Sequence, residues 1–350
     1  MKRITSTKIV VAMSGGVDSS VAAALLKEQG HDVIGITMQI WPSKKAFGGC
    51  CSLEAVDDAK AVAARLGIPH YVLNFRNVFK DKVINDFIEE YKNGRTPNPC
   101  IRCNQFIKFD HLAQKARELG AESVATGHYA RIVNSKLLKG RDKKKDQSYV
   151  LYMMDQESLA HTLYPLGDLT KTEVRKLAKD LDLPVAEKAE SQEICFVEED
   201  DYGRFLKETY PEAVQPGQIV DKAGNVVGQH DGIAFFTLGQ RKGIGHHKGQ
   251  PKYVIRLDRE NNAVVIGDKE DTLGKELIAE QVSYISGTVP KGPLAVMAKI
   301  RYNSSEVEAV LEPELCRARV TFEEAQQSIT PGQSVVFYKG EEVIGGGIIS

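Results

Sequence analysis

Three serines and two glycines lie together in Ser14–Ser20, which reads SGGVDSS and follows a short apolar run. At the start of a helix, unpaired backbone N–H groups and the helix dipole favour an anion such as phosphate. Gly15 and Gly16 let the backbone bend closely around a phosphate because they carry no Cβ. Asp18 is a candidate ligand for Mg²⁺, which prefers carboxylate and phosphate oxygens. The stretch therefore predicts a nucleotide site, and its alternative is a plain glycine turn with a serine helix cap.

The phosphate-binding pattern GxxxxGK[ST] is absent from the sequence, and no lysine ends this loop. The usual machinery for transferring a γ-phosphate is therefore not expected. The loop instead resembles the PP-loop of the ATP pyrophosphatase families, which bind the pyrophosphate unit of ATP and release AMP. That resemblance leaves GMP synthetase, NAD synthetase, argininosuccinate synthetase, lysidine synthetase and the tRNA thiolases open.

Thiols are the second group of residues that could do chemistry. In Gly94–Phe109, which reads GRTPNPCIRCNQFIKF, Cys100 and Cys103 form a CxxC where a loop enters a helix. A helix start stabilises a thiolate through its dipole. Cys195 lies in the stretch AESQEICFV at 189–197.

These thiols allow three interpretations: a zinc or iron–sulfur site on Cys100, Cys103 and Cys195, buried structural cysteines, or a thiol pair that handles sulfur. A structural zinc site normally has four ligands, often as two such pairs. Neither a second CxxC nor an HxxxH occurs in the chain. We expect Cys50 and Cys51 to serve packing.

Four motifs in order carry a closer resemblance. SGGVDSS, GRTPNPCIRCNQFIKF, ATGHYAR at 125–131 and AESQEICFV together resemble the tRNA-specific 2-thiouridylases, bacterial enzymes that thiolate the wobble uridine. The resemblance continues to the segment GQSVVFY at 332–338 and so covers nearly the whole chain.

The resemblance implies a role for individual residues. Cys103 matches the nucleophile, and Cys195 matches the cysteine that carries a persulfide. Some members have an aspartate in place of Cys100, so Cys100 is not expected to be an essential nucleophile. The positions that match the ATP site are Ala12, Met13, Ser14, Gly15, Gly16, Val17, Asp18, Ser19, Met38 and Gly127. The positions that match tRNA contacts are Asn98, Pro99, Cys100, His128, Lys145, Asp146, Gln147, Arg301, Tyr302 and Gln333.

The implied reaction acts on the wobble uridine of the tRNAs for lysine, glutamate and glutamine. ATP adenylates the C2 oxygen with loss of pyrophosphate, and sulfur from the Cys195 persulfide then replaces AMP. Attack by Cys103 leaves a Cys103–Cys195 disulfide that a reductant reopens. ATP with Mg²⁺ and a sulfur-relay or cysteine desulfurase protein are implied, and an iron–sulfur cluster is an alternative sulfide carrier.

Apolar runs and helical patterns alternate over the first 130 residues, which predicts an α/β domain with a parallel sheet. The expected strands are 8–13, 32–40, 70–75 and 123–126, and the expected helices are 19–29, 53–66, 78–92, 105–119 and 172–180. The basic stretch 137–146 interrupts this pattern and is interpreted as a mobile loop. Beyond residue 214, alternating apolar residues and glycines predict antiparallel strands. The expected domains are a PP-loop domain at 1–210, a small β-rich linking domain at 211–275 and a C-terminal β-barrel at 276–350.

Composition limits the class of protein. A chain of 350 residues, 42% hydrophobic and 27% charged, is typical of a globular protein with two or three domains. A formal net charge of −1 argues against a passive nucleic-acid coat but allows local basic patches, for which 139–145 and 241–248 are candidates. The absence of an 18-residue apolar run predicts no membrane span and a cytoplasmic location.

Two other functions fit part of the sequence. A PP-loop ligase or amidating enzyme that adenylates a small molecule would need neither the CxxC, nor Cys195, nor a β-barrel. A non-enzymatic RNA-binding module would not need the PP-loop. Release of AMP and pyrophosphate that depends on tRNA would separate these functions from thiolation.

Overall fold

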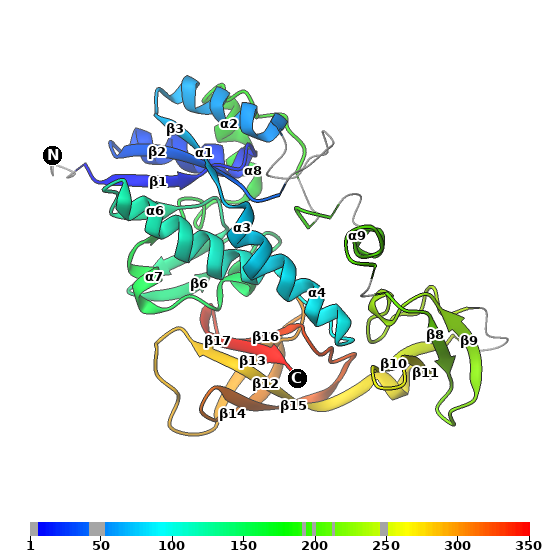
Figure 1. Ribbon diagram of the computed structural model, residues 1–350. Coiled ribbons are helices and arrows are strands. Elements are labelled where there is room, and N and C mark those ends of the chain that lie inside the picture. Colours follow the sequence, from blue (N-terminus) through cyan, green and yellow to red (C-terminus); the bar gives the residue numbers. More distant parts are fainter. Residues whose placement is uncertain (1–5, 42–52, 191–193, 198–200, 212–213, 246–250) are drawn as a thin grey trace.

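The computed structural model describes residues 6–41, 53–190, 194–197, 201–211, 214–245 and 251–350. Figure 1 shows an α/β unit at one end, a barrel at the other, and a small sheet beside the barrel. This arrangement confirms the predicted α/β fold class with a β-rich module and a C-terminal barrel. None of the helices in the described ranges is long and apolar enough to cross a membrane.

The first sheet is entirely parallel and has the strand order β3-β2-β1-β4-β7. Four of its strands fall where the apolar runs predict them, and the short β7 is an addition. The strands are β1 (Lys8–Ala12), β2 (Asp32–Gln39), β3 (His70–Asn74), β4 (Ser123–Ala125) and β7 (Thr162–Leu163).

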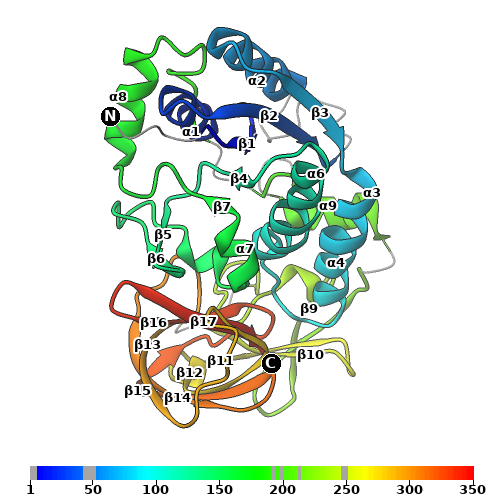
Figure 2. The same cartoon turned by 90° about the vertical axis from the view of Figure 1, so that its left-hand side faces the viewer.

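Helices cover both faces of this sheet, as Figure 2 shows. Alternate residues of β1 point to opposite faces: Ile9 and Val11 pack with α1 (Val17–Glu28), α2 (Leu53–Leu66) and α8 (Lys171–Asp180). Thr170 caps α8 in a capping box with Glu173.

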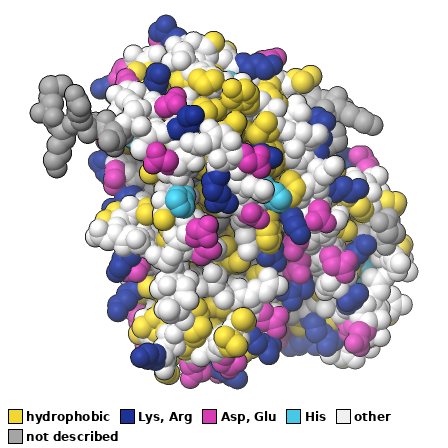
Figure 3. All heavy atoms as spheres, turned by 60° about the vertical axis from the view of Figure 1, so that its left-hand side comes forward, with side chains coloured by type: hydrophobic (Ala, Val, Ile, Leu, Met, Phe, Trp, Pro, Cys, Tyr) yellow, Lys and Arg dark blue, Asp and Glu magenta, His cyan; other side chains and the backbone are white. Residues whose placement is uncertain are grey.

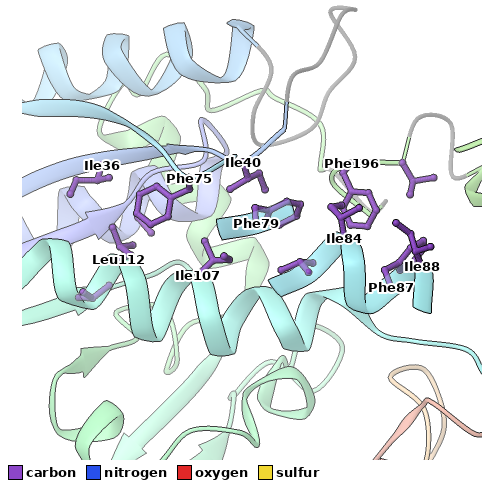
Figure 4. Close-up of a cluster of buried hydrophobic side chains, with 14 of the residues drawn as sticks. Ile36, Ile40, Phe75, Phe79, Ile84, Phe87, Ile88, Ile107, Leu112 and Phe196 are labelled. Atoms are coloured by element: carbon purple, nitrogen blue, oxygen red, sulfur yellow. The ribbon is translucent and has the colours of Figure 1, made fainter. Parts of the chain in front are cut away.

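Val10 and Ala12 face a second cluster on the other side of the sheet. Figure 4 shows this cluster, in which aromatic and branched side chains from separate helices meet around Phe79 and Phe87. The helices concerned are α3 (Arg76–Phe79), η1 (Lys80–Ile84), α4 (Asn85–Lys92), η2 (Cys103–His111), α6 (Leu112–Glu118) and α9 (Tyr202–Thr209). The short helix α5 (Pro99–Arg102) directly precedes η2, and its Ile101 packs in a different cluster.

The prediction of a loop at 137–146 is wrong for 137–139, which belong to a strand, whereas 140–146 form bends and turns. β5 (Ala130–Val133) and β6 (Lys136–Lys139) form a hairpin, and β6 also pairs with the last strand of the barrel. Leu137 is completely buried in a cluster shared with the barrel. Within the stretch, Lys139 pairs with Glu306 at 2.7 Å and Lys145 with Glu190 at 2.6 Å, and Lys136 just before it pairs with Glu342 at 2.8 Å. A single buried leucine thus outweighs the polar character of its neighbours.

The barrel has six antiparallel strands closed by the pairing of the first, β12, with the last, β17. Glycines allow this closure, because a Cβ on Gly345 would lie 2.1 Å from the carbonyl oxygen of Ser283. The strands are β12 (Leu273–Tyr284), β13 (Leu294–Lys299), β14 (Val307–Pro313), β15 (Arg317–Gln327), β16 (Ser334–Lys339) and β17 (Glu342–Ile349).

The small sheet has the order β10-β11-β8-β9 and lies between the α/β unit and the barrel in the sequence. Helix α9 (Tyr202–Thr209) precedes it. Its strands are β8 (Gly217–Val220), β9 (Val226–His230), β10 (Tyr253–Asp258) and β11 (Ala263–Gly267).

Buried tyrosines join the α/β unit to the barrel. The Tyr149 hydroxyl donates to the carbonyl oxygen of Ser334 at 2.7 Å, and the Tyr152 and Ser334 hydroxyls lie 3.0 Å apart. Both tyrosines are almost completely buried. Because polar groups without partners are costly in such a place, these bonds fix how the barrel sits on the α/β unit.

We predict that Tyr149→Phe lowers the free energy of unfolding by about 1–3 kcal/mol, because it leaves a buried carbonyl without its donor. Urea titration followed by far-UV circular dichroism measures this. The matched control is Tyr71→Phe, whose ring is 47% exposed and whose change should be small. Equal effects of the two substitutions would show that the Tyr149 hydroxyl does not hold the interface.

Candidate active site

The loop between β1 and α1 lies at the carboxyl edge of the parallel sheet. The Ser19 hydroxyl accepts from the Ser14 N–H at 3.2 Å and donates to the Gly16 carbonyl at 3.2 Å. The Ser20 hydroxyl donates to the same carbonyl at 2.8 Å. Gly16 is the N-cap residue and no side chain caps α1. The first-turn N–H groups of α1 are therefore suited to an anion from outside.

Backbone meets backbone around this loop. A Cβ on Gly127, just after β4, would lie 2.8 Å from the Asp18 carbonyl carbon and the Ser19 nitrogen. Gly15 has φ +68°, and a Cβ there would lie 2.2 Å from the carbonyl oxygen of Ala55. Only glycine fits at these two positions, so the predicted ATP-site residue Gly15 packs closely against α2 and the predicted Gly127 packs closely against the start of α1. The predicted Met38 lies on the adjacent strand β2 and is partly buried.

Asp18 is engaged by two side chains from distant parts of the chain. Lys171 Nζ donates to its two carboxylate oxygens at 2.7 and 2.9 Å, and the Tyr129 hydroxyl donates at 2.7 Å. Burial, reinforced by the Asp18 carboxylate, raises the pKa of Tyr129, so this hydroxyl remains a donor. A carboxylate can accept more than these three bonds, and the role of Asp18 as a Mg²⁺ ligand stays a prediction.

Glu190 continues this charged network. Its carboxylate lies 2.6 Å from Lys145 Nζ, 3.3 Å from Lys171 Nζ and 3.9 Å from Arg175. The hydrogen bond from Lys145 is the main cause that lowers the pKa of Glu190, which keeps it ionised. One carboxylate thus links the loop that carries Lys145 to the start of α8.

A second charged contact lies beside Gly127. Lys108 Nζ is 3.3 Å from His128 Nε2, and His128 Nδ1 is 2.7 Å from the Thr126 hydroxyl. Burial, followed by the charge of Lys108, lowers the pKa of His128 well below its usual value. The imidazole is therefore neutral. Because an ammonium can only donate, Nε2 accepts and Nδ1–H donates to Thr126.

Cys103 and Cys195 pack against one hydrophobic cluster. Cys103 begins the helical stretch η2, and Cys195 precedes Phe196, whose ring lies 5.2 Å from that of Phe87. The four cysteines of the described part of the chain are thiols and form no disulfide, and Cys100 is exposed. Cys50 and Cys51, expected to serve packing, lie outside the described residues.

The alternative of a metal or iron–sulfur site on Cys100, Cys103 and Cys195 has no preformed site. Across the described ranges, no group of three or more histidine, cysteine, aspartate or glutamate side chains could hold a metal ion. A cluster on these three thiols would require the cysteines to move together.

The loop before Cys100 is held by the barrel. Asn98 caps α5 by accepting from the Cys100 N–H at 3.1 Å, and Pro99 follows as the first helical residue. Gln333 Nε2 donates to the Thr96 carbonyl at 2.8 Å. Two predicted tRNA contacts, Asn98 and Gln333, therefore shape this loop from opposite sides.

The other predicted tRNA residues also make internal contacts. The Arg301 guanidinium donates to the carbonyls of Leu238 and Ser328 at 3.1 and 3.0 Å. Tyr302 is 38% exposed, and its ring lies 5.9 Å from that of Tyr149. Asp146 accepts from the Gly140 and Ser148 N–H groups, and the Gln147 side chain accepts from the Tyr129 N–H. On the face shown in Figure 3, basic and acidic side chains are intermixed.

Sequence reasoning missed Lys171, Tyr129, Glu190 and Lys108. Lys171 stands 153 positions after Asp18, and its capping threonine explains only why a helix begins there. Tyr129 lies in the same motif as Gly127, and Lys108 lies in the same motif as Cys103. This closeness in sequence to predicted site residues could have pointed to both. Glu190 had a similar signal, because it is the second residue of the motif at 189–197 that contains Cys195.

Models of three protein families match consecutive parts of the chain. They are the tRNA methyl transferase HUP domain at 7–199, the tRNA methyl transferase PRC-barrel domain at 203–268 and the aminomethyltransferase beta-barrel domain at 274–349. A solved 4-thiouridine synthetase in complex with RNA and ATP is 16% identical to this chain, with a TM-score of 0.36. The match covers 59% of this chain and 51% of the synthetase, and this similarity is too low to support a function.

Curated relatives match the whole chain. A tRNA-specific 2-thiouridylase of Clostridium perfringens is 52% identical over 99% of both chains. The tRNA-specific 2-thiouridylase of Heliobacterium modesticaldum is 56% identical over 97% of this chain and 92% of its own, and that of Acetivibrio thermocellus is 52% identical over 99% and 100%. With this identity from one end to the other, the chain belongs to the family of tRNA-specific 2-thiouridylases.

Proposed function

We propose that this protein is a sulfurtransferase that uses ATP to replace the C2 oxygen of the wobble uridine of tRNA with sulfur. The observation that carries the proposal is one α/β unit holding both an uncapped, glycine-lined helix start and two thiols on a common cluster. The helix start suits the phosphates of ATP, and the thiols suit sulfur transfer. Family membership supplies the substrate class.

Activation is the first step. The C2 oxygen of uridine is a poor leaving group, so it attacks the α-phosphorus of ATP. The bond between the α-phosphorus and the bridging oxygen breaks, and its electron pair leaves with pyrophosphate. The loop at 14–19 and Gly127 are the proposed phosphate site, with Ala12, Met13 and Met38 beside it. Oriented N–H donors suit the charge that develops on the leaving group.

Sulfur transfer is the second step. The terminal sulfur of a Cys195 persulfide attacks C2, and AMP leaves. The Cys103 thiolate then attacks the Cys195 sulfur, which breaks the bond to the transferred sulfur and forms a Cys103–Cys195 disulfide. The released thiolate is the 2-thiouridine product. A reductant restores both thiols, and a sulfur-relay or cysteine desulfurase protein reloads Cys195.

Binding energy from tRNA must offset the cost of removing a wobble base from its stack, which is a few kcal/mol. We assign this contact to the loop at 98–100, His128, the loop at 145–147, Arg301 and Tyr302, and Gln333. The tRNAs for lysine, glutamate and glutamine are the proposed substrates, in the cytoplasm. The rival assignment to a small-molecule ligase is not favoured, because it leaves the thiols and the barrel without a role.

We predict that Cys103→Ser and Cys195→Ser each abolish formation of 2-thiouridine while tRNA-dependent release of pyrophosphate continues. A hydroxyl can neither carry a persulfide nor displace one. The assay combines ATP, unmodified tRNA and a persulfide donor, with mass spectrometry of the digested nucleosides and a pyrophosphate assay. Cys316→Ser is the matched control, because this cysteine is exposed on the barrel. Thiolation by either variant at the rate of the unchanged protein would contradict the scheme.

We predict that Gly127→Val lowers the rate of pyrophosphate release about 100-fold, because its side chain would push the start of α1 out of place. The measurement is pyrophosphate release over a range of ATP concentrations at saturating tRNA. Gly292→Ala is the control, since a Cβ there meets no atom within 4 Å. An unchanged rate in Gly127→Val would rule out this helix start as the nucleotide site.

A further inference from the structure

The side chain of Lys171 forms ion pairs with two carboxylates beside the proposed nucleotide loop. It contacts both oxygens of Asp18 at 2.7 and 2.9 Å and Glu190 at 3.3 Å, and it is only 12% exposed. Burying much of an ammonium is costly unless it is paired. The two acids therefore hold a positive charge at the first turn of α1.

A nucleotide loop without a lysine has no full positive charge to balance the phosphates of ATP. The triphosphate of ATP brings several negative charges, and hydroxyls with backbone N–H groups offer only partial positive charges. The loop at 14–19 contains no basic residue. Lys171 contacts Asp18 within this loop, whereas Lys145 and Arg175 contact Glu190. Arg175 also donates to the backbone carbonyls of residues 186 and 188.

We propose that Lys171 is a further nucleotide-site residue, whose ammonium neutralises the pyrophosphate unit of ATP, and that Glu190 competes for it when the site is empty. This inference rests on the proposed function and deepens it. The lysine that the loop lacks in sequence is supplied by the start of α8.

The contact distances indicate how the exchange takes place. An ammonium has three donors. The two oxygens of Asp18 are the closer partners, and Glu190 at 3.3 Å is the more distant one. Glu190 also has Lys145 at 2.6 Å, so it stays paired when Lys171 leaves it. An arriving phosphate oxygen therefore displaces Glu190 rather than Asp18.

The same contact serves the reaction. When the bond between the α-phosphorus and the bridging oxygen breaks, negative charge accumulates on the departing pyrophosphate. An ammonium already held at that place stabilises this charge without reorganisation.

The experiment is calorimetric titration of ATP, of inorganic pyrophosphate and of AMP into the full chain. We expect Lys171→Met to weaken pyrophosphate binding about 10- to 100-fold, the effect of one charge-assisted contact, while AMP binding is retained. Lys171→Arg should restore most of the loss, because the charge remains. Lys176→Met, on the exposed side of the same helix, is the matched control.

Glu190→Gln gives the opposite sign and does not depend on how well Lys171→Met folds. Removing the competing charge should tighten pyrophosphate binding, whereas a merely structural Glu190 would weaken it. The proposal is overturned if Lys171→Met binds pyrophosphate like the unchanged protein, if it loses AMP to the same extent, or if Glu190→Gln weakens pyrophosphate binding. If the unchanged protein binds neither pyrophosphate nor ATP, the proposed function itself is wrong.

Discussion

The start of α1 and the end of β4 meet with no side chain between them, and the proposed nucleotide site depends on this contact. Gly127 lies against the backbone of Asp18 and Ser19, and Gly15 lies against that of Ala55. The N-cap residue of α1 is Gly16, which has no side chain, so the first N–H groups of α1 have no capping side chain. A helix start is then suited to an anion because its own donors are unsatisfied and its dipole is positive there.

Around this contact, acidic and basic side chains pair with one another, so no excess of one sign of charge builds up. Lys171 lies between Asp18 and Glu190, and Glu190 in turn pairs with Lys145. Ion pairs that are only partly exposed keep their geometry better than those on the open surface, where solvent screens them. A chain with almost no net charge can therefore present positive groups at chosen places, which is consistent with a protein that binds both a nucleotide and an RNA.

The barrel contributes more than a separate module would. The Gln333 side chain of the barrel donates to the Thr96 carbonyl in the loop before Cys100. The Pro331 carbonyl accepts from the Thr96 N–H at 2.8 Å. Tyr149 and Tyr152 fasten the barrel to the α/β unit from the other side. Several residues that the family resemblance assigns to tRNA contact thus also hold the loops on which the proposed contacts depend. A substitution at Gln333 or Arg301 would therefore alter the shape of the site as well as its surface.

The sequence by itself determined the α/β class, the order of strands and helices in the first unit, and the loop at 14–20, because these follow from local periodicity and from glycine and serine chemistry. It also predicted that Cys103 and Cys195 are the reactive thiols, which stays a prediction. Only the tertiary structure decided that Lys171 reaches Asp18, that Glu190 is shared, and that 136–139 is a strand of the barrel sheet. Those features depend on contacts between residues on separate elements, 153 positions apart for Asp18 and Lys171 and 45 for Lys145 and Glu190, or on burial of one side chain such as Leu137. No local pattern in a single sequence encodes either.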